Sequence, residues 1–153
     1  MTAVLVEPSN CNLRTFKPAF SRITSSIRCR RTALQSSQCD EHLSLVDLPG
    51  IDLSGATLDT AILEGANLVA ANLKEARLRQ VNLTAAKLCG ANLMGADLYR
   101  ADLRGTDLRE THFMEANLTG ADFTGADLRG ANLAGADLRD ACFMGTDLSG
   151  AHG

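Results

Sequence analysis

The side chains of this sequence that could do chemistry are its carboxylates, five cysteines and three histidines. No Cys-x-x-Cys pair occurs, and His42, His112 and His152 are scattered, so the spacing of a metal site is missing. A nucleophilic site would need a base within hydrogen-bond reach and a third group to orient it. The aspartates instead recur every five residues, which indicates a repeat rather than an acid–base pair. We therefore expect a protein that is not an enzyme and that uses no metal or cofactor.

These side chains belong to a five-residue repeat that runs without interruption from Val46 to Gly150. The central residue of each of its 21 units is apolar, with eighteen Leu and three Phe, and the residue two positions earlier is Ala in fifteen units. Residues two apart in an extended segment share a face, so each unit points one large and one small side chain inward. The residue between them is Asp in nine units and Asn in six, and it faces solvent.

Glycine marks the end of many units, since twelve of the thirteen glycines stand at the fifth position. A type II turn requires a positive φ at its second central residue, and glycine adopts that conformation at no steric cost. The pattern therefore predicts a corner every five residues. An α-helix is excluded because a period of five matches neither 3.6 nor 3.5 residues, and glycine would interrupt the helix repeatedly.

The repeat resembles the pentapeptide repeat family, whose pattern is Ala, Asp or Asn, Leu and two variable residues. Units 96–100, 126–130 and 131–135 match that pattern directly, and the resemblance covers about 105 of the 153 residues. It implies an all-β fold, a right-handed quadrilateral β-helix with four units per coil. About five coils would result, and at a strand spacing of about 4.8 Å the solenoid would be about 25 Å long.

The first 38 residues have a different composition, with six basic residues against the single acid Glu7 and many Ser and Thr. This composition is typical of an organelle transit peptide, and a disordered basic tail is the alternative. The segment has neither the apolar run and cleavage site of a secretory signal nor a membrane span. We expect a leader over residues 1–39 and a chloroplast protein, in the stroma rather than the thylakoid lumen. A mitochondrion or a bacterial cytoplasm is the alternative location.

The two ends of the solenoid, expected over residues 46–153, would expose an apolar cross-section. Residues 40–45 could cap the first coil, with Asp40 as a helix N-cap and Leu43 or Leu45 packed on the coil. No covering element is evident after the last unit. This end predicts end-to-end homo-association.

In the four-fold wrap that the resemblance implies, residues twenty apart stack on one face. One face of zero net charge gathers three arginines around the single tyrosine, where an arginine one coil below the ring suggests a cation–π pair or an anion site. The next face carries a column of exposed methionines and a histidine between asparagines. The alternative is a solvated face whose arginines pair with Asp97 and Asp137. The candidate partner-binding residues are Arg77, Arg79, Tyr99, Arg100, Met94, Met114 and His112.

A function in recognition follows, because the repeat offers a rigid surface without catalytic insertions. We expect a scaffold for an unidentified protein partner. The alternative, implied by the resemblance, is a DNA mimic that modulates a type II topoisomerase such as gyrase. A 25 Å duplex carries about 15 phosphate charges. The repeat carries fifteen acidic and nine basic residues, a net charge of −6, which is low for a mimic. A nucleic acid is not expected as a partner.

Overall fold

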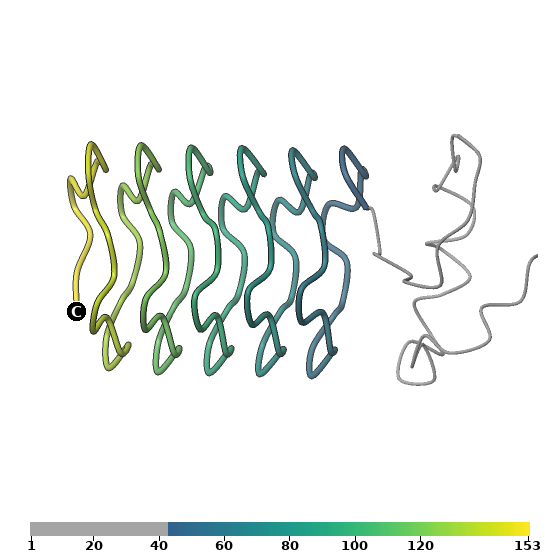
Figure 1. Cartoon of the computed structure of the whole chain (residues 1–153), viewed down its shortest axis with the longest axis horizontal. Helices are drawn as coiled ribbons and strands as arrows, with labels where there is room; N and C mark the ends of the chain where they lie inside the picture. The colour runs from purple at the N-terminus through teal and green to yellow at the C-terminus, as the bar shows by residue number, and fades with distance from the viewer. Residues whose placement is uncertain (1–42) are drawn as a thin grey trace, which may run out of the picture.

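The computed structural model describes residues 43–153, which form a single rod of stacked coils (Figure 1). Within this range there is no helix, and each unit contributes one bridge residue and one turn rather than a long strand. The right-handed quadrilateral β-helix predicted from the repeat is confirmed. The predicted leader, residues 1–39, and residues 40–42 of the predicted cap lie outside the described residues.

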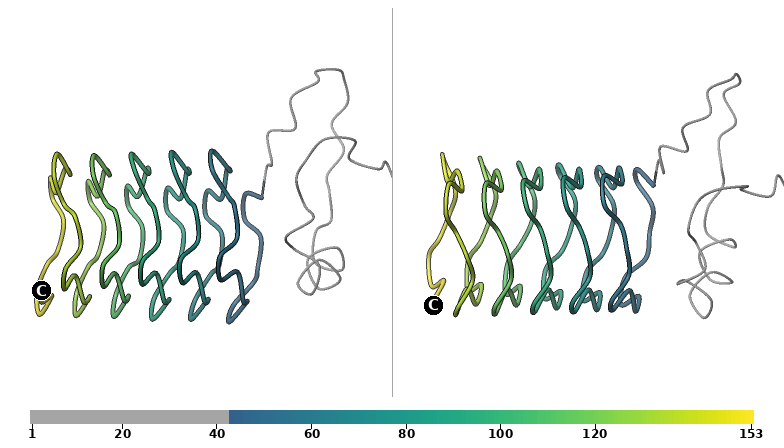
Figure 2. Two further views of the ribbon diagram at one scale, coloured as in Figure 1. Left: turned by 90° about the horizontal axis from the view of Figure 1, so that it is seen from below. Right: turned by 60° about the horizontal axis from the view of Figure 1, so that its bottom comes forward.

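The coils are in strict register, because parallel bridges join residues twenty apart from Asp47↔Asn67 to Asn132↔His152. Four units therefore complete one coil. The N–H of Asn92 donates to the Ala71 carbonyl at 2.9 Å, in the coil below. Two further views show the coils stacked in line (Figure 2). This register places every outward side chain directly above the residue twenty positions earlier.

The core consists of the two inward columns that the sequence predicted. Leu93 and Ala91, in a middle coil, are fully buried. The Phe123 and Phe143 rings stack with centroids 5.0 Å apart and planes inclined by 4°, and Phe113 meets Phe123 edge-on at 6.2 Å. Aromatic pairs in these two geometries contribute about 0.5–1.5 kcal/mol beyond the area that they bury.

Threonine replaces alanine as the small inward residue in a few units. Its hydroxyl donates a hydrogen bond to a backbone carbonyl of the solenoid. The Oγ1 atoms of Thr106 and Thr111 donate to the Leu83 and Leu88 carbonyls, each at 3.0 Å. Thr146 donates in the same way to the Phe123 carbonyl at 2.7 Å. These bonds cross from one coil to the coil below, so they add directional contacts to an otherwise apolar core.

Each corner is a turn in which the N–H of the next unit's first residue bonds the carbonyl of the central residue, as Ala96 does to Leu93 at 3.0 Å. The fifth residue of every unit has a positive φ, whether or not it is glycine. This confirms the conformation that the glycine pattern predicted. Ten non-glycine residues adopt it, with φ between 54° and 61°.

Residues 43–45, the described part of the predicted cap, form one more turn of the repeat. The N–H groups of Leu43 and Leu45 bond the carbonyls of Ile62 and Glu64, each at 2.8 Å. Leu43 packs against the core, but Leu45 is 80% exposed and takes the positive-φ position of the turn. The repeat therefore begins before Val46, the first residue that the sequence pattern assigned to it.

Candidate functional site

Most arginines on the rod are held by an aspartate two residues earlier in the same unit. Arg104 contacts Asp102 at 2.6 Å, and Arg139 contacts Asp137 at 2.6 Å. Hydrogen bonds from the Arg139 guanidinium, followed by its backbone N–H, lower the pKa of Asp137 to about 2. A pair with Asp137 was the alternative expected from the sequence, and each such exposed pair contributes little to stability by itself.

On one face the pairs join into a series that we call the charge ladder: Asp107, Arg109, Asp127, Arg129 and Asp147. Arg109 binds Asp107 at 2.8 Å and reaches Asp127 of the next coil at 3.8 Å. Arg129 binds Asp127 at 2.7 Å and reaches Asp147 at 3.8 Å. The guanidiniums lower the pKa of Asp107 and Asp127. Arg109 and Arg129 therefore offset part of the negative charge of the three aspartates in the ladder.

A different arrangement occurs at one corner of the rod, where Arg77 stands in the position that Asp or Asn usually occupies. In most units that carboxylate or amide accepts the N–H two residues on, as Asp102 does from Arg104 at 3.2 Å. Here Asp59, from the coil below, replaces it. One Asp59 oxygen accepts the Arg79 N–H at 3.0 Å, and the other accepts the Arg77 guanidinium at 2.7 Å. The departure at Arg77 is therefore compensated by a second residue.

Tyr99 lies next to this group, in contact with two guanidiniums. The Cζ of Arg79 is 5.1 Å from the centroid of the Tyr99 ring, and that of Arg100 is 5.2 Å away. Both distances are within the range of a cation–π contact. The predicted pair of Arg79 with Tyr99 is confirmed, and Arg100 adds a second. Arg79 also lies 3.7 Å from Asp97, the partner that the sequence analysis considered.

Beneath these side chains, glycine is absent from the fifth position in three successive coils. Thr60, Gln80 and Arg100 stack at the fifth position with φ of 61°, 56° and 54°. In the other columns of residues 43–153, every non-glycine residue at the fifth position has a glycine directly above it, twenty residues later. A left-handed conformation costs a non-glycine residue about 1–2 kcal/mol, and such outliers cluster at functional sites.

Gly120 ends this run, directly above Arg100. A Cβ on Gly120 would lie 3.2 Å from the Arg100 Cγ, so the absence of a side chain leaves room for the arginine stem.

These residues surround a shallow depression of about 230 Å³, lined by Asp59, Thr60, Arg77, Arg79, Gln80 and Tyr99. We call this group, together with Arg100, the arginine–tyrosine corner. Four of its members, Arg77, Arg79, Tyr99 and Arg100, were predicted from the sequence. Asp59, Thr60 and Gln80 were missed. The run of three successive fifth positions without glycine in this column could have indicated Thr60 and Gln80.

The other predicted site residues lie on the neighbouring face, away from this corner. His112 is exposed and bridges Asn92 and Asn132, as the register predicted. Met94 and Met114 are half-buried rather than fully exposed. The exposed methionine of the described chain is Met144, at 71%. Met94 and Met114 therefore offer less apolar surface than the sequence predicted.

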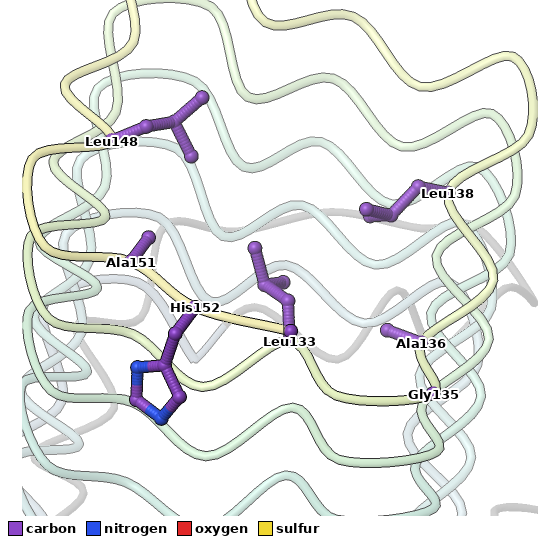
Figure 3. Close-up of a pocket in the computed structure, with 8 residues that line it drawn as sticks. Leu133, Gly135, Ala136, Leu138, Leu148, Ala151 and His152 are labelled. Atoms are coloured by element: carbon purple, nitrogen blue, oxygen red, sulfur yellow. The ribbon is translucent and has the colours of Figure 1, made fainter.

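A second depression, of about 350 Å³, opens at the end of the last coil. Leu133, Leu138 and Leu148 point toward one another there, and the His152 imidazole turns away from them (Figure 3). The lining is the interior of the core seen in cross-section, because these leucines continue the buried Leu column.

Other reactive groups are dispersed over the rod. Cys89 and Cys142 are free and half-buried, and Cys142 Sγ lies 3.5 Å from the Thr124 hydroxyl. Among residues 43–153, no three His, Cys, Asp or Glu side chains gather where they could hold a metal ion.

Comparison with protein families matches the chain to "Pentapeptide repeats", in eight copies over residues 42–74, 76–113 and 111–150. No curated protein matches the sequence.

Solved structures of similar proteins share the repeat. A pentapeptide repeat protein, Rfr23, from the cyanobacterium Cyanothece 51142 is 29% identical over 66% of this chain and 86% of its own, with a TM-score of 0.58. A thylakoid lumen pentapeptide repeat protein from Arabidopsis thaliana is 37% identical over 72% of this chain and 66% of its own, with a TM-score of 0.44. HetL, involved in heterocyst differentiation regulation in Nostoc sp. strain PCC 7120, is 26% identical over 87% of this chain and 77% of its own, with a TM-score of 0.46.

Proposed function

Because the chain belongs to the pentapeptide repeat family, we propose that it is a non-enzymatic scaffold whose rigid surface binds a protein partner. The observation that carries this proposal is the arginine–tyrosine corner. Asp59 from a neighbouring coil binds the Arg77 guanidinium and the Arg79 backbone N–H, and the Tyr99 ring contacts the Arg79 and Arg100 guanidiniums. Every unit places its fifth residue at positive φ, so the feature particular to this corner is its set of side-chain contacts, which favours recognition over simple solvation.

Affinity capture tests this proposal. The full chain, tagged and incubated with an organelle extract, should retain a specific protein. Tyr99→Ala should lose that protein, because it removes the ring that both guanidiniums contact. Arg139→Gln is the matched control, since Arg139 is exposed on the same face but pairs with Asp137. Capture that is unchanged in Tyr99→Ala would place the interaction elsewhere on the rod.

The location that we propose is the chloroplast stroma, with a mitochondrion or a bacterial cytoplasm as alternatives. The support is the basic, hydroxyl-rich composition of residues 1–38. None of the residues that the structure describes forms a helix of the length and apolar character needed to cross a membrane. A fluorescent reporter fused after residues 1–45 should enter the organelle. A reporter that stays in the cytosol would contradict the transit peptide.

The second candidate function is modulation of gyrase by DNA mimicry, to which the family resemblance gives the precedent. The charge ladder argues against it, because Arg109 and Arg129 lie against the aspartates that would have to imitate phosphates. A supercoiling assay with purified gyrase decides between the two functions. Inhibition or protection of gyrase at micromolar protein would favour mimicry over the scaffold.

End-to-end homo-association stays a prediction. The surface in question is the leucine-lined depression after the last coil (Figure 3). Sedimentation velocity of the full chain should show association that increases with protein concentration. A monomer at high concentration would contradict it.

A further inference from the structure

Arg100 differs from the other arginines of the rod in its electrostatic environment. Among residues 43–153, six arginines have a carboxylate oxygen within 4.0 Å, and Arg100 has none. Its guanidinium lies against the Tyr99 ring instead. Because no carboxylate oxygen lies within 4.0 Å of it among residues 43–153, the N–H donors of this guanidinium stay available for hydrogen bonds with an anion.

The charge around Arg100 is opposite in sign to that of the rod as a whole. Arg77, Arg79 and Arg100 outnumber Asp59 and Asp97, so this local group has a net charge of +1, whereas residues 46–150 carry −6. An acidic group is therefore repelled by most of the surface and attracted here. Such a contrast provides orientation and specificity more than raw affinity.

The depression beside Arg100 limits the size of what can bind. Its volume of about 230 Å³ is below the roughly 300–1,000 Å³ that is typical of pockets for small molecules and cofactors. It suits one side chain of a partner rather than a whole ligand. Arg79 lines the depression, and Arg100 contacts the Tyr99 ring that lines it. A guanidinium fork matches the geometry of a carboxylate or phosphate.

We propose that the arginine–tyrosine corner binds an oxyanion carried by an acidic segment of the partner protein, with Arg100 and Arg79 as donors and Tyr99 holding both in position. This inference rests on the proposed scaffold function and names the chemistry that its partner presents. Asp59 takes no part in the contact. It binds the Arg77 guanidinium and the Arg79 backbone N–H, and the Tyr99 ring contacts the two donor guanidiniums before the partner arrives.

The test measures fluorescence anisotropy of a labelled hexaglutamate peptide titrated with the full chain at low salt. Arg100→Gln should weaken binding about tenfold, since one charge-assisted hydrogen-bonding fork is lost. Two controls remove a positive charge elsewhere. Arg139→Gln removes an arginine that Asp137 already neutralises, and Lys87→Gln removes a cation with no carboxylate within 4.0 Å among residues 43–153. Both should change the affinity less than about twofold.

Hexaglutamine should not bind, and inorganic phosphate should displace hexaglutamate from the wild-type chain. Equal losses in Arg100→Gln, Arg139→Gln and Lys87→Gln would overturn the proposal, because binding would then follow net charge alone. The absence of hexaglutamate binding would also overturn it. Tighter binding of a single-stranded oligonucleotide than of hexaglutamate would do the same. If the peptide fails but Tyr99→Ala still abolishes capture of the natural partner, the scaffold function stands and only the oxyanion chemistry is wrong.

Discussion

Leu93 and Asn92 are adjacent in the chain but lie on opposite sides of the coil wall. Leu93 is fully buried, whereas Asn92 is partly exposed and accepts the Met94 N–H at 3.1 Å. Leu93→Ala should cost about 2–5 kcal/mol of unfolding free energy, because it leaves a cavity in a core closed on all sides. Asn92→Ala should cost under about 1 kcal/mol. Urea unfolding of the two variants checks this, and equal losses would contradict the inner and outer columns.

Thr60 carries a conformational cost that glycine would not. A left-handed conformation costs a non-glycine residue about 1–2 kcal/mol. Glycine avoids this cost, but it loses more backbone entropy on folding, which destabilises the folded state by about 0.5–1 kcal/mol. Thr60→Gly should therefore raise the unfolding free energy by up to about 1.5 kcal/mol, as measured by urea unfolding. Gly50→Ala is the matched control and should lower the unfolding free energy. The φ of Gly50 is 65°, and nothing lies within 4 Å of an added Cβ, so only the backbone conformation is tested. A loss of stability in Thr60→Gly would show that its side-chain contacts outweigh the strain.

The aspartates that pair with arginines make the rod sensitive to acid. Hydrogen bonds and charges of the guanidiniums lower the pKa of Asp102, Asp107 and Asp127 from 3.8, and that of Asp137 to about 2. The folded state thus binds fewer protons than the unfolded state. The stabilisation is complete above about pH 5 and is lost as the pH falls toward about 2. Thermal unfolding between these limits should show it. Asp137→Asn should flatten the profile, and an unchanged slope would mean that these pairs contribute nothing.

The repeating elements could be read from the sequence, but the details of the corner could not. The Leu column, the turns and the four-fold stacking follow from a period of five and the family resemblance, because each depends on one residue type at one position. The roles of Asp59 and Gly120 depend on which side chain stands twenty residues away and on how far it reaches. Arg77 and Asp59 are 18 positions apart, so their contact becomes evident only when the coil is closed. The half-burial of Met94 and Met114 also did not follow from the repeat pattern, which places both at outward positions.

The rod as a whole behaves as a one-dimensional stack, in which each coil contacts only its neighbours. Removing residues 121–140 deletes one full coil and leaves every later residue on its original face. We expect this variant to fold, to keep the arginine–tyrosine corner and to bind hexaglutamate like the wild type. Its urea m-value should fall by roughly a fifth, because less surface is exposed on unfolding. A variant that does not unfold cooperatively would contradict this modular description.

The bridges that join residues twenty apart have a consequence for how the chain finds its fold. Because nearly every unit offers the same Leu and Ala to the interior, a growing solenoid that slips by one unit loses little apolar contact. Contacts between particular side chains break this degeneracy. The Phe143 ring stacks on the Phe123 ring, and the Arg77 guanidinium binds the Asp59 carboxylate. The residues that depart from the repeat therefore favour one register of the coils over other registers of nearly equal energy during folding.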